Sequence, residues 1–168
     1  TIEDHVPNVT LSIQPDICID GGLVNLTNVS PVATTGQTST ISGTGLTGQS
    51  FNPQTAGVGQ HIMTHVFLDE NGCTNTAVDT INVHAIPVVG ISGLDPAYCL
   101  SMDIITPIIT PANGNLQGPG VTNNTFSSAD AGTGNHTLTL NYTDENGCMN
   151  STSFTLNVYS APPPNFTI

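Results

Sequence analysis

The fold is decided by the stretch His136–Cys148, which reads HTLTLNYTDENGC. Its first eight residues alternate between polar and apolar side chains, a period of two that is typical of a β-strand with one buried face. The segment Glu145–Gly147 suits a three-residue hairpin loop, a type I turn followed by a glycine in the left-handed conformation. A second alternating run follows, and together the two runs predict an antiparallel hairpin in which Leu138 faces Phe154.

The same hairpin occurs twice in the chain. The sequence DENGC at residues 144–148 repeats DENGC at residues 69–73, and the offset is 75 residues. Flanking residues match at the same offset, among them Phe51 with Phe126 and His61 with His136. Upstream the offset grows to 81, which one insertion of six residues explains. Chance does not produce this register, so the chain holds two copies of one domain.

The repeat sets the expected domain boundaries. We place the first domain at residues 7–86 and the second at residues 87–163. Residues 1–6 correspond to the tail of a preceding repeat or to a linker, and residues 164–168 to the first strand of a following repeat. Two interpretations fit such ends: a segment of a longer array, or a strand that completes a neighbouring subunit.

The charge composition excludes several classes of protein. The 168 residues include 12 Asp and Glu but no Lys or Arg, which gives a formal net charge of −12. Without a basic patch we expect no nucleic-acid partner. Without lysine or arginine, Schiff-base chemistry and phosphoryl-transfer clamps are absent too, and we expect no enzyme. No apolar run approaches the roughly 18 residues of a membrane span, so no direct membrane insertion is expected.

The composition also favours an all-β fold. Thr is abundant, and it is a good strand former and a poor helix former. Short strands with frequent Gly and Pro turn signals recur in each copy. They predict two tandem immunoglobulin-like antiparallel β-sandwich domains.

Each copy contains two cysteines at matched positions. We predict one disulfide in each domain, Cys18–Cys73 and Cys99–Cys148. Closing loops of this size stabilises a small domain by about 4 kcal/mol in the chain-entropy model. A metal site or free thiols are the alternatives, but no CxxC or Cys/His spacing supports a metal site. Disulfides imply an oxidising compartment, so we expect an extracellular or cell-surface protein.

Three segments of the second copy resemble a known repeat. They read PGVTNNTF at residues 119–126, AGTGNHTLT at residues 131–139 and YTDENGC at residues 142–148. This pattern is similar to the tandem immunoglobulin-like or PKD-like repeats of Bacteroidota cell-surface adhesins and gliding-associated proteins. The resemblance implies a secreted stalk, fibre or adhesin and supplies no catalytic residues. The first copy is more divergent, and loss of all Lys and Arg is not a rule of that family.

We therefore expect a non-enzymatic extracellular structural module whose partners are neighbouring copies of itself or adjacent repeats of the same chain. One alternative is a filament subunit assembled head to tail, in which Phe166 and Ile168 add a strand to the next molecule's sheet. A second alternative is a ligand-binding adhesin domain. With no Trp and three Tyr, the chain has little material for an aromatic binding platform.

One strand of the first copy is apolar on the face that should meet water. The side chains are Ile62, Val66 and Leu68, where the second copy has Thr and Asn. Either a loop or the six-residue insertion covers this face, or it is a contact surface in an assembly.

Acidic residues with no basic partners make calcium the only candidate cofactor. The candidate ligands are Glu3 and Asp4 before the first domain and Asp69 and Asp144 at the hairpin tips. No EF-hand spacing is present, so solvated turns are the alternative. Asp79 replaces Phe154 of the other copy, and we expect it to pair with His61 or His65 rather than to act in catalysis.

Overall fold

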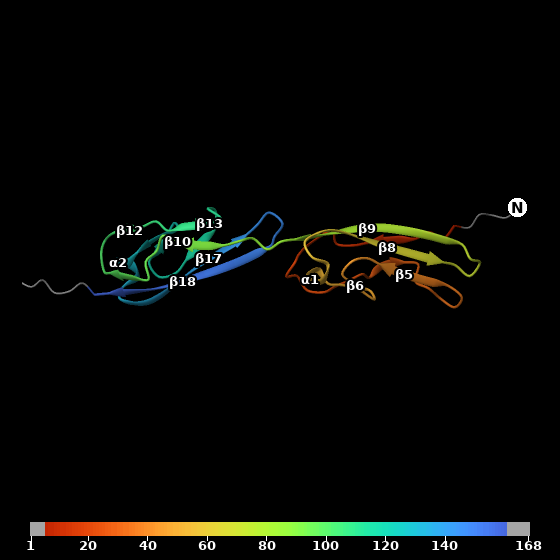
Figure 1. The fold of residues 1–168 in the computed structure, drawn as a ribbon, viewed down its shortest axis with the longest axis horizontal. Coiled ribbons are helices and arrows are strands. Elements are labelled where there is room, and N and C mark those ends of the chain that lie inside the picture. Colours follow the sequence, from red (N-terminus) through yellow and green to blue (C-terminus); the bar gives the residue numbers. More distant parts are fainter. Residues whose placement is uncertain (1–5, 161–168) are drawn as a thin grey trace, which may run out of the picture. The chain divides into compact units, whose positions relative to one another are not determined.

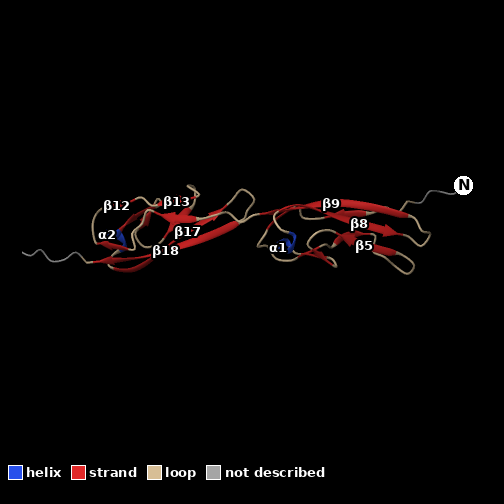
Figure 2. Cartoon of the chain, in the orientation of Figure 1, coloured by secondary structure: helices blue, strands red, loops and turns tan. Residues whose placement is uncertain are grey.

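The structure, a computed structural model, describes residues 6–160 and divides the chain into two compact units, Thr1–Ile86 and Pro87–Ile168. Strands make up most of each unit, with one short helix in each (Figures 1 and 2). None of the helices in this described part has the length and hydropathy of a membrane span.

The main sheet of the first unit has four strands. Their order is β2 (Asp16–Cys18), β9 (Thr74–His84), β8 (Gly59–Leu68) and β5 (Thr38–Ser42). Strand β2 runs parallel to β9, whereas the other neighbours are antiparallel. Residues in β8 and β9 alternate between buried and exposed along much of each strand, as a sheet with one covered face requires.

Shorter strands cover the inner face of this sheet. They are β1 (Thr10–Ser12) paired with β4 (Asn28–Ser30), and β3 (Val24–Asn25), β7 (Ser50–Phe51) and β6 (Leu46–Thr47) in a second small sheet. The buried core consists of Phe51, Met63, Ile81 and Val83, and residues of the covering strands pack against it. The unit is therefore a small β-sandwich.

The second unit repeats this plan. Its main sheet has the order β11 (Ala97–Cys99), β18 (Met149–Tyr159), β17 (Gly134–Thr143) and β14 (Asn115–Gln117). The covering strands are β10 (Gly90–Ser92) with β13 (Ile108–Thr110), and β12 (Ile104–Ile105), β16 (Thr125–Ser127) and β15 (Val121–Thr122). The core contains Leu116, Phe126, Leu138, Leu140, Leu156 and Val158. The predicted all-β class with two tandem sandwich domains is confirmed.

The hairpin formed by residues 136–158 has the predicted geometry. Leu138 faces Phe154 across β17 and β18. The Asp144 N–H donates to the Cys148 carbonyl at 2.9 Å, and the Gly147 N–H donates to the Asp144 carbonyl at 3.1 Å. Gly147 has φ of 82°, the left-handed conformation that favours glycine there.

A one-turn helix follows the middle strands of each unit. These helices are α1 (Pro53–Ala56), capped by Asn52, and α2 (Ser128–Ala131), capped by Ser127. Each lies close against a glycine with positive φ. A Cβ on Gly120 would lie 2.4 Å from the Ser127 carbonyl oxygen, and one on Gly45 would lie 2.6 Å from the Ala56 Cβ. This close approach explains why both copies carry a glycine at this position of the repeat.

Candidate functional site

The cysteines of each unit lie at opposite ends of its longest strand. In the first unit Cys18 lies opposite His84, the last residue of β9, in the register of the two strands. Cys73, in contrast, directly precedes Thr74, the first residue of β9. At a rise of about 3.3 Å per residue, β9 separates these two ends by about 33 Å. A disulfide requires Cα atoms within about 7 Å of each other, so the two cysteines of one unit are too far apart.

The second unit has the same arrangement. Cys99 lies opposite Tyr159, at the end of β18, and Cys148 directly precedes Met149, at its beginning. Cys18 and Cys148 are each disulfide-bonded, whereas Cys73 and Cys99 are free thiols. The predicted pairs Cys18–Cys73 and Cys99–Cys148 are therefore wrong, because matched counts of cysteine say nothing about the length of the strand between them.

The hairpin cysteines are held by an aspartate turn. Asp144 Oδ1 accepts the N–H groups of Asn146 at 3.0 Å and of Cys148 at 2.8 Å. Asp69 makes the same two bonds to Asn71 and Cys73, at 2.9 and 2.8 Å. These carboxylates therefore fix the backbone of the residue that carries the sulfur.

The hairpin also clasps the segment where the chain enters its unit. Asn150 Nδ2, two residues beyond Cys148, donates to the Pro87 carbonyl at 2.8 Å. Asn75 makes the same bond to the Pro7 carbonyl, also at 2.8 Å. This pair of asparagines was not predicted from the sequence. The recurring Cys-x-Asn, together with a proline at the start of each copy, was the available signal.

The other two cysteines, Cys18 and Cys99, lie on the short parallel strands β2 and β11, next to the end of the last strand of each unit. The Ile19 N–H donates to the His84 carbonyl at 2.8 Å, and the Leu100 N–H donates to the Tyr159 carbonyl at 2.8 Å. Next to Cys99, the buried Ser128 Oγ lies 3.1 Å from the Cys99 carbonyl oxygen. The backbone at Cys99 is thus fixed, while its side chain is exposed.

An ion pair fastens the strand of Cys18 to β9. Asp16 Oδ1 lies 2.8 Å from His84 Nε2. This hydrogen bond holds the pKa of the Asp16 carboxyl below its usual value, and a further one from Asn82 acts in the same direction. The second unit has Ala97 and Tyr159 at these positions, so the device is specific to the first unit.

The apolar face predicted on β8 is open in the first unit. Ile62 is 59% exposed and Val66 is 37% exposed, and Val78 of the adjacent strand β9 is 59% exposed. Leu68 is half-buried. The described loops and the six-residue insertion do not cover Ile62 and Val66. In the second unit the same face carries hydroxyl pairs instead, Thr137 with Thr155 at 3.2 Å and Thr139 with Ser153 at 3.1 Å.

Asp79 lies opposite Met63 on the neighbouring strand, but it does not pair with a histidine. Its Oδ2 accepts the Ile13 N–H at 2.8 Å, which ties the chain after β1 to the main sheet. His61 Nε2 lies 2.8 Å from the Gly57 carbonyl oxygen, and His65 bonds to Ser39 and Thr10. The expected Asp–His pair is wrong, because a nearby backbone N–H takes the carboxylate.

For calcium, the described residues contain no group of three or more His, Cys, Asp or Glu side chains placed to hold a metal ion. Asp69 and Asp144 serve their turns, whereas Glu3 and Asp4 lie outside the described residues, as do Phe166 and Ile168. Calcium binding stays a prediction.

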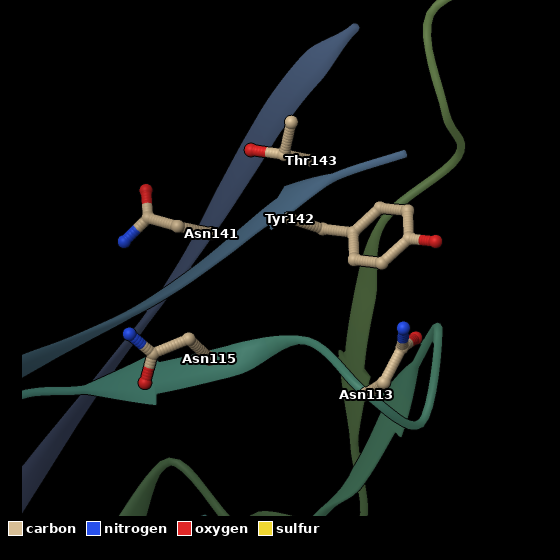
Figure 3. A pocket seen from close by; sticks show the side chains of 5 residues that line it. All are labelled: Asn113, Asn115, Asn141, Tyr142 and Thr143. Atoms are coloured by element: carbon tan, nitrogen blue, oxygen red, sulfur yellow. The ribbon is translucent and has the colours of Figure 1, made fainter. Parts of the chain in front are cut away.

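A shallow hollow of about 260 Å³ lies beside β17 in the second unit. Its lining is polar and neutral and consists of Asn113, Asn115, Asn141, Tyr142 and Thr143 (Figure 3). Asn115 and Asn141 are cross-strand neighbours on β14 and β17. This lining offers hydrogen bonds but no nucleophile paired with a base.

Comparison with known proteins gives structural likenesses only. No family model matches the chain, and no curated protein matches it. Fibronectin(III)-like modules of CbhA from Clostridium thermocellum are 16% identical, with a TM-score of 0.37, and the match covers 96% of this chain and 99% of that one.

Two further structures belong to longer chains. The protein SGBP-B of the mixed-linkage glucan utilization locus of Bacteroides ovatus, in complex with a mixed-linkage heptasaccharide, is 13% identical, with a TM-score of 0.32. The match covers 93% of this chain and 46% of that one. Immunoglobulin domains 1–4 of Sidekick-1 are 13% identical, with a TM-score of 0.39, and the match covers 90% of this chain and 48% of that one.

Proposed function

We propose that the chain is a non-enzymatic structural module of an extracellular stalk or fibre, of the kind built from the bacterial adhesin repeats that its sequence resembles. The observation that carries this proposal is the repeated plan. Two units with the same strand order, the same hairpin clasp and the same helix position follow one another in the chain. Length by repetition is what such an arrangement supplies.

The hydrogen bonding of the polar side chains supports a mechanical role. Asp79, His61, His65 and Asn150 each bond to a backbone group of another segment in their own unit. These side chains tie strands together, and nothing about their partners favours proton transfer to a substrate. Cys18 and Cys148 are each disulfide-bonded, which supports an oxidising, extracellular location.

One observation supports the alternative of a filament built from separate subunits. It is the open apolar face formed by Ile62, Val66 and Val78. Exposed apolar side chains that cluster on a sheet face commonly mark contacts between proteins. In this alternative the units have the same mechanical role, but neighbouring subunits are separate chains rather than parts of one polypeptide.

Antibodies against the chain test the proposal on cells of the source organism. Labelling of intact cells supports a surface module, whereas labelling only after the cells are broken overturns it. A denaturing gel with reductant then separates the alternatives. An array runs as one polypeptide far above 17.3 kDa, and a subunit runs near that mass.

A further inference from the structure

In the second unit the edge strand β14 stops short of the end of β17. Asn115, its first residue, is paired with Asn141, and no residue of the described chain is paired with Tyr142 or Thr143 on that side. In the first unit the edge strand β5 covers the same stretch, because its first residue is paired with Leu68, the counterpart of Thr143. The last two residues of β17 therefore have an open edge that their counterparts in β8 lack.

The open edge leaves two backbone groups of Thr143 free. Across the hairpin, the Asp144 N–H donates to the Cys148 carbonyl at 2.9 Å. Successive residues of an antiparallel strand direct their N–H and C=O groups to opposite sides, so those of Thr143 point away from β18 and toward the side of β14. Within residues 6–160 the strand pairing gives neither group a backbone partner there.

Three asparagines surround this edge. The first hollow is lined by Asn113, Asn115, Asn141, Tyr142 and Thr143 (Figure 3). All three asparagines are exposed, and among the described residues none of their side-chain amides is hydrogen-bonded to a protein group. Asn124 and Asn150 of the same unit differ, because their amides bond to the backbone. Each free amide offers both donors and an acceptor to a ligand.

A second hollow continues the site across β17. It has a volume of about 340 Å³ and shares three lining residues, Asn141, Tyr142 and Thr143, with the first. Strand β18 adds the hydroxyl of Ser151 and the side chain of Met149, which is 69% exposed. The two hollows together offer a ligand hydrogen bonds from several directions and apolar surface for one of its faces.

We propose that these two hollows bind a neutral carbohydrate. Sugar rings carry hydroxyl groups at their edges and C–H groups on their faces, so amides, hydroxyls and a few apolar or aromatic side chains are the groups that recognise them. The chain has no Lys or Arg, and Asp144 and Glu145 directly follow the site, so carboxylated or sulfated sugars are repelled. The inference goes beyond the proposed structural role and does not depend on it.

A peptide strand fits this site less well than a sugar. Strand addition takes its affinity from a row of main-chain hydrogen bonds along a sheet edge. Here Thr143 alone directs free backbone groups to the open edge, and the remaining polar groups belong to side chains.

The first unit lacks the groups that make this site. At the positions of Asn115 and Asn141 it has Thr40 and Val66, which are paired in the same register. Its counterpart of Tyr142 is a phenylalanine, which has no hydroxyl. We therefore expect carbohydrate to bind the second unit only.

Calorimetric titration of the full chain with oligosaccharides tests the site. The neutral probes are cellohexaose, xylohexaose, mannohexaose and N-acetylated chitohexaose, and the acidic probe is hexagalacturonic acid. We expect at least one neutral probe to bind with a Kd of about 1 mM, because a shallow site makes few contacts, and the acidic probe not to bind. Failure of every neutral probe to bind, or tighter binding of the acidic probe, overturns the proposal.

A double variant locates the binding. Asn115→Thr with Asn141→Val gives the second unit the residues of the first, and the affinity for the bound probe should fall by at least about tenfold, because the hydrogen bonds of two amides are lost. Asn135→Val is the matched control, since Asn135 is exposed on the same strand outside both hollows, and it should bind as the wild type does. Unchanged affinity of the double variant overturns the assignment.

A measurement on the wild-type chain covers the case in which the double variant does not fold, which tyrosine-monitored melting reveals. The side-chain amide signals of Asn115 and Asn141 in nuclear magnetic resonance spectra should shift when the bound probe is added, and signals that stay in place overturn the site. Surface labelling of cells is unaffected by either result, so this proposal and the proposed function fail separately.

Discussion

His65 and Leu140 occupy the same position in the two copies, and both are fully buried. His65 bonds to Ser39 Oγ at 2.9 Å and lies 3.2 Å from the Thr10 carbonyl oxygen, which joins β5 and β1 to β8. In the second unit Gly114 replaces Ser39, and a Cβ there would lie 2.8 Å from Leu140 Cδ1. The two positions have therefore changed together, a polar pair in one copy and an apolar packing contact in the other.

His65→Leu should destabilise the first unit by about 1–3 kcal/mol, because the Ser39 hydroxyl and the Thr10 carbonyl lose their partner. Adding Ser39→Gly should recover part of that loss by making room for the leucine. All three tyrosines lie in the second unit, so tyrosine fluorescence reports that unit and far-ultraviolet circular dichroism reports both. The variant should shift the dichroism transition and leave the fluorescence transition in place; a shift of the fluorescence transition alone contradicts the assignment.

Asp16 gives a prediction about pH. Its pKa is lowered in the folded state by His84, so at acidic pH the unfolded state binds more protons. The contribution of Asp16 is therefore present above the ordinary pKa of an aspartate and is lost as the pH falls through the lowered one. Asp16→Asn should flatten the acid limb of the unfolding free energy against pH, measured by circular dichroism. Asp20→Asn is the control, and equal curves for both variants would be incompatible with the ion pair.

At the scale of elements, the long hairpins were predictable and the short strands were not. Residues 136–158 carry a strong period-two pattern and a turn whose glycine requirement is visible, so both register and turn follow from the sequence. Strands β2 and β11 have three residues each, too few for a period, and their parallel pairing depends on the rest of the fold. Because Cys18 and Cys99 lie on those strands, the sequence did not reveal that each is a whole strand length away from the other cysteine of its unit.

Variants of Asp144 distinguish a structural role of its carboxylate in the hairpin turn from a role in calcium binding. Asp144→Ala removes the acceptor for the Asn146 and Cys148 N–H groups and should cost about 1 kcal/mol of stability in the second unit. Asp144→Asn keeps an acceptor oxygen and should retain most of that stability. Tyrosine-monitored melting measures both variants with and without calcium. A calcium-dependent rise in the wild-type midpoint that both variants abolish would establish the predicted metal site instead.

The open face of β8 and β9 makes a prediction about assembly. Ile62→Thr with Val66→Thr gives the first unit the polar character that the second unit has at these positions. Since both side chains are exposed, the free energy of unfolding should change by about 0.5 kcal/mol or less. Association at high concentration, measured by sedimentation, should weaken. The matched control Thr137→Ser with Asn141→Ser should associate as the wild type does, and unchanged association of the first variant removes the contact surface.

At the scale of the whole molecule, the chain consists of two units that share one strand order. Each unit has its own core, so folding does not need a bond between its own two cysteines. The repeat was readable from the sequence because DENGC and its flanking residues match at the same offset. The bonding partner of each cysteine depends instead on the length of the strand that separates the two cysteines of a unit. A matched pair of cysteines in each copy therefore does not identify the bonding partner of either cysteine.

A disulfide map of the oxidised wild-type chain tests this account most directly. After cleavage before Asp without reductant, we predict free thiols on peptides 69–78 and 95–102, whereas the cysteines of peptides 16–19 and 144–168 are blocked in disulfides. Links from peptide 16–19 to 69–78 and from 95–102 to 144–168 would contradict it, because they would restore a closed bridge inside each unit.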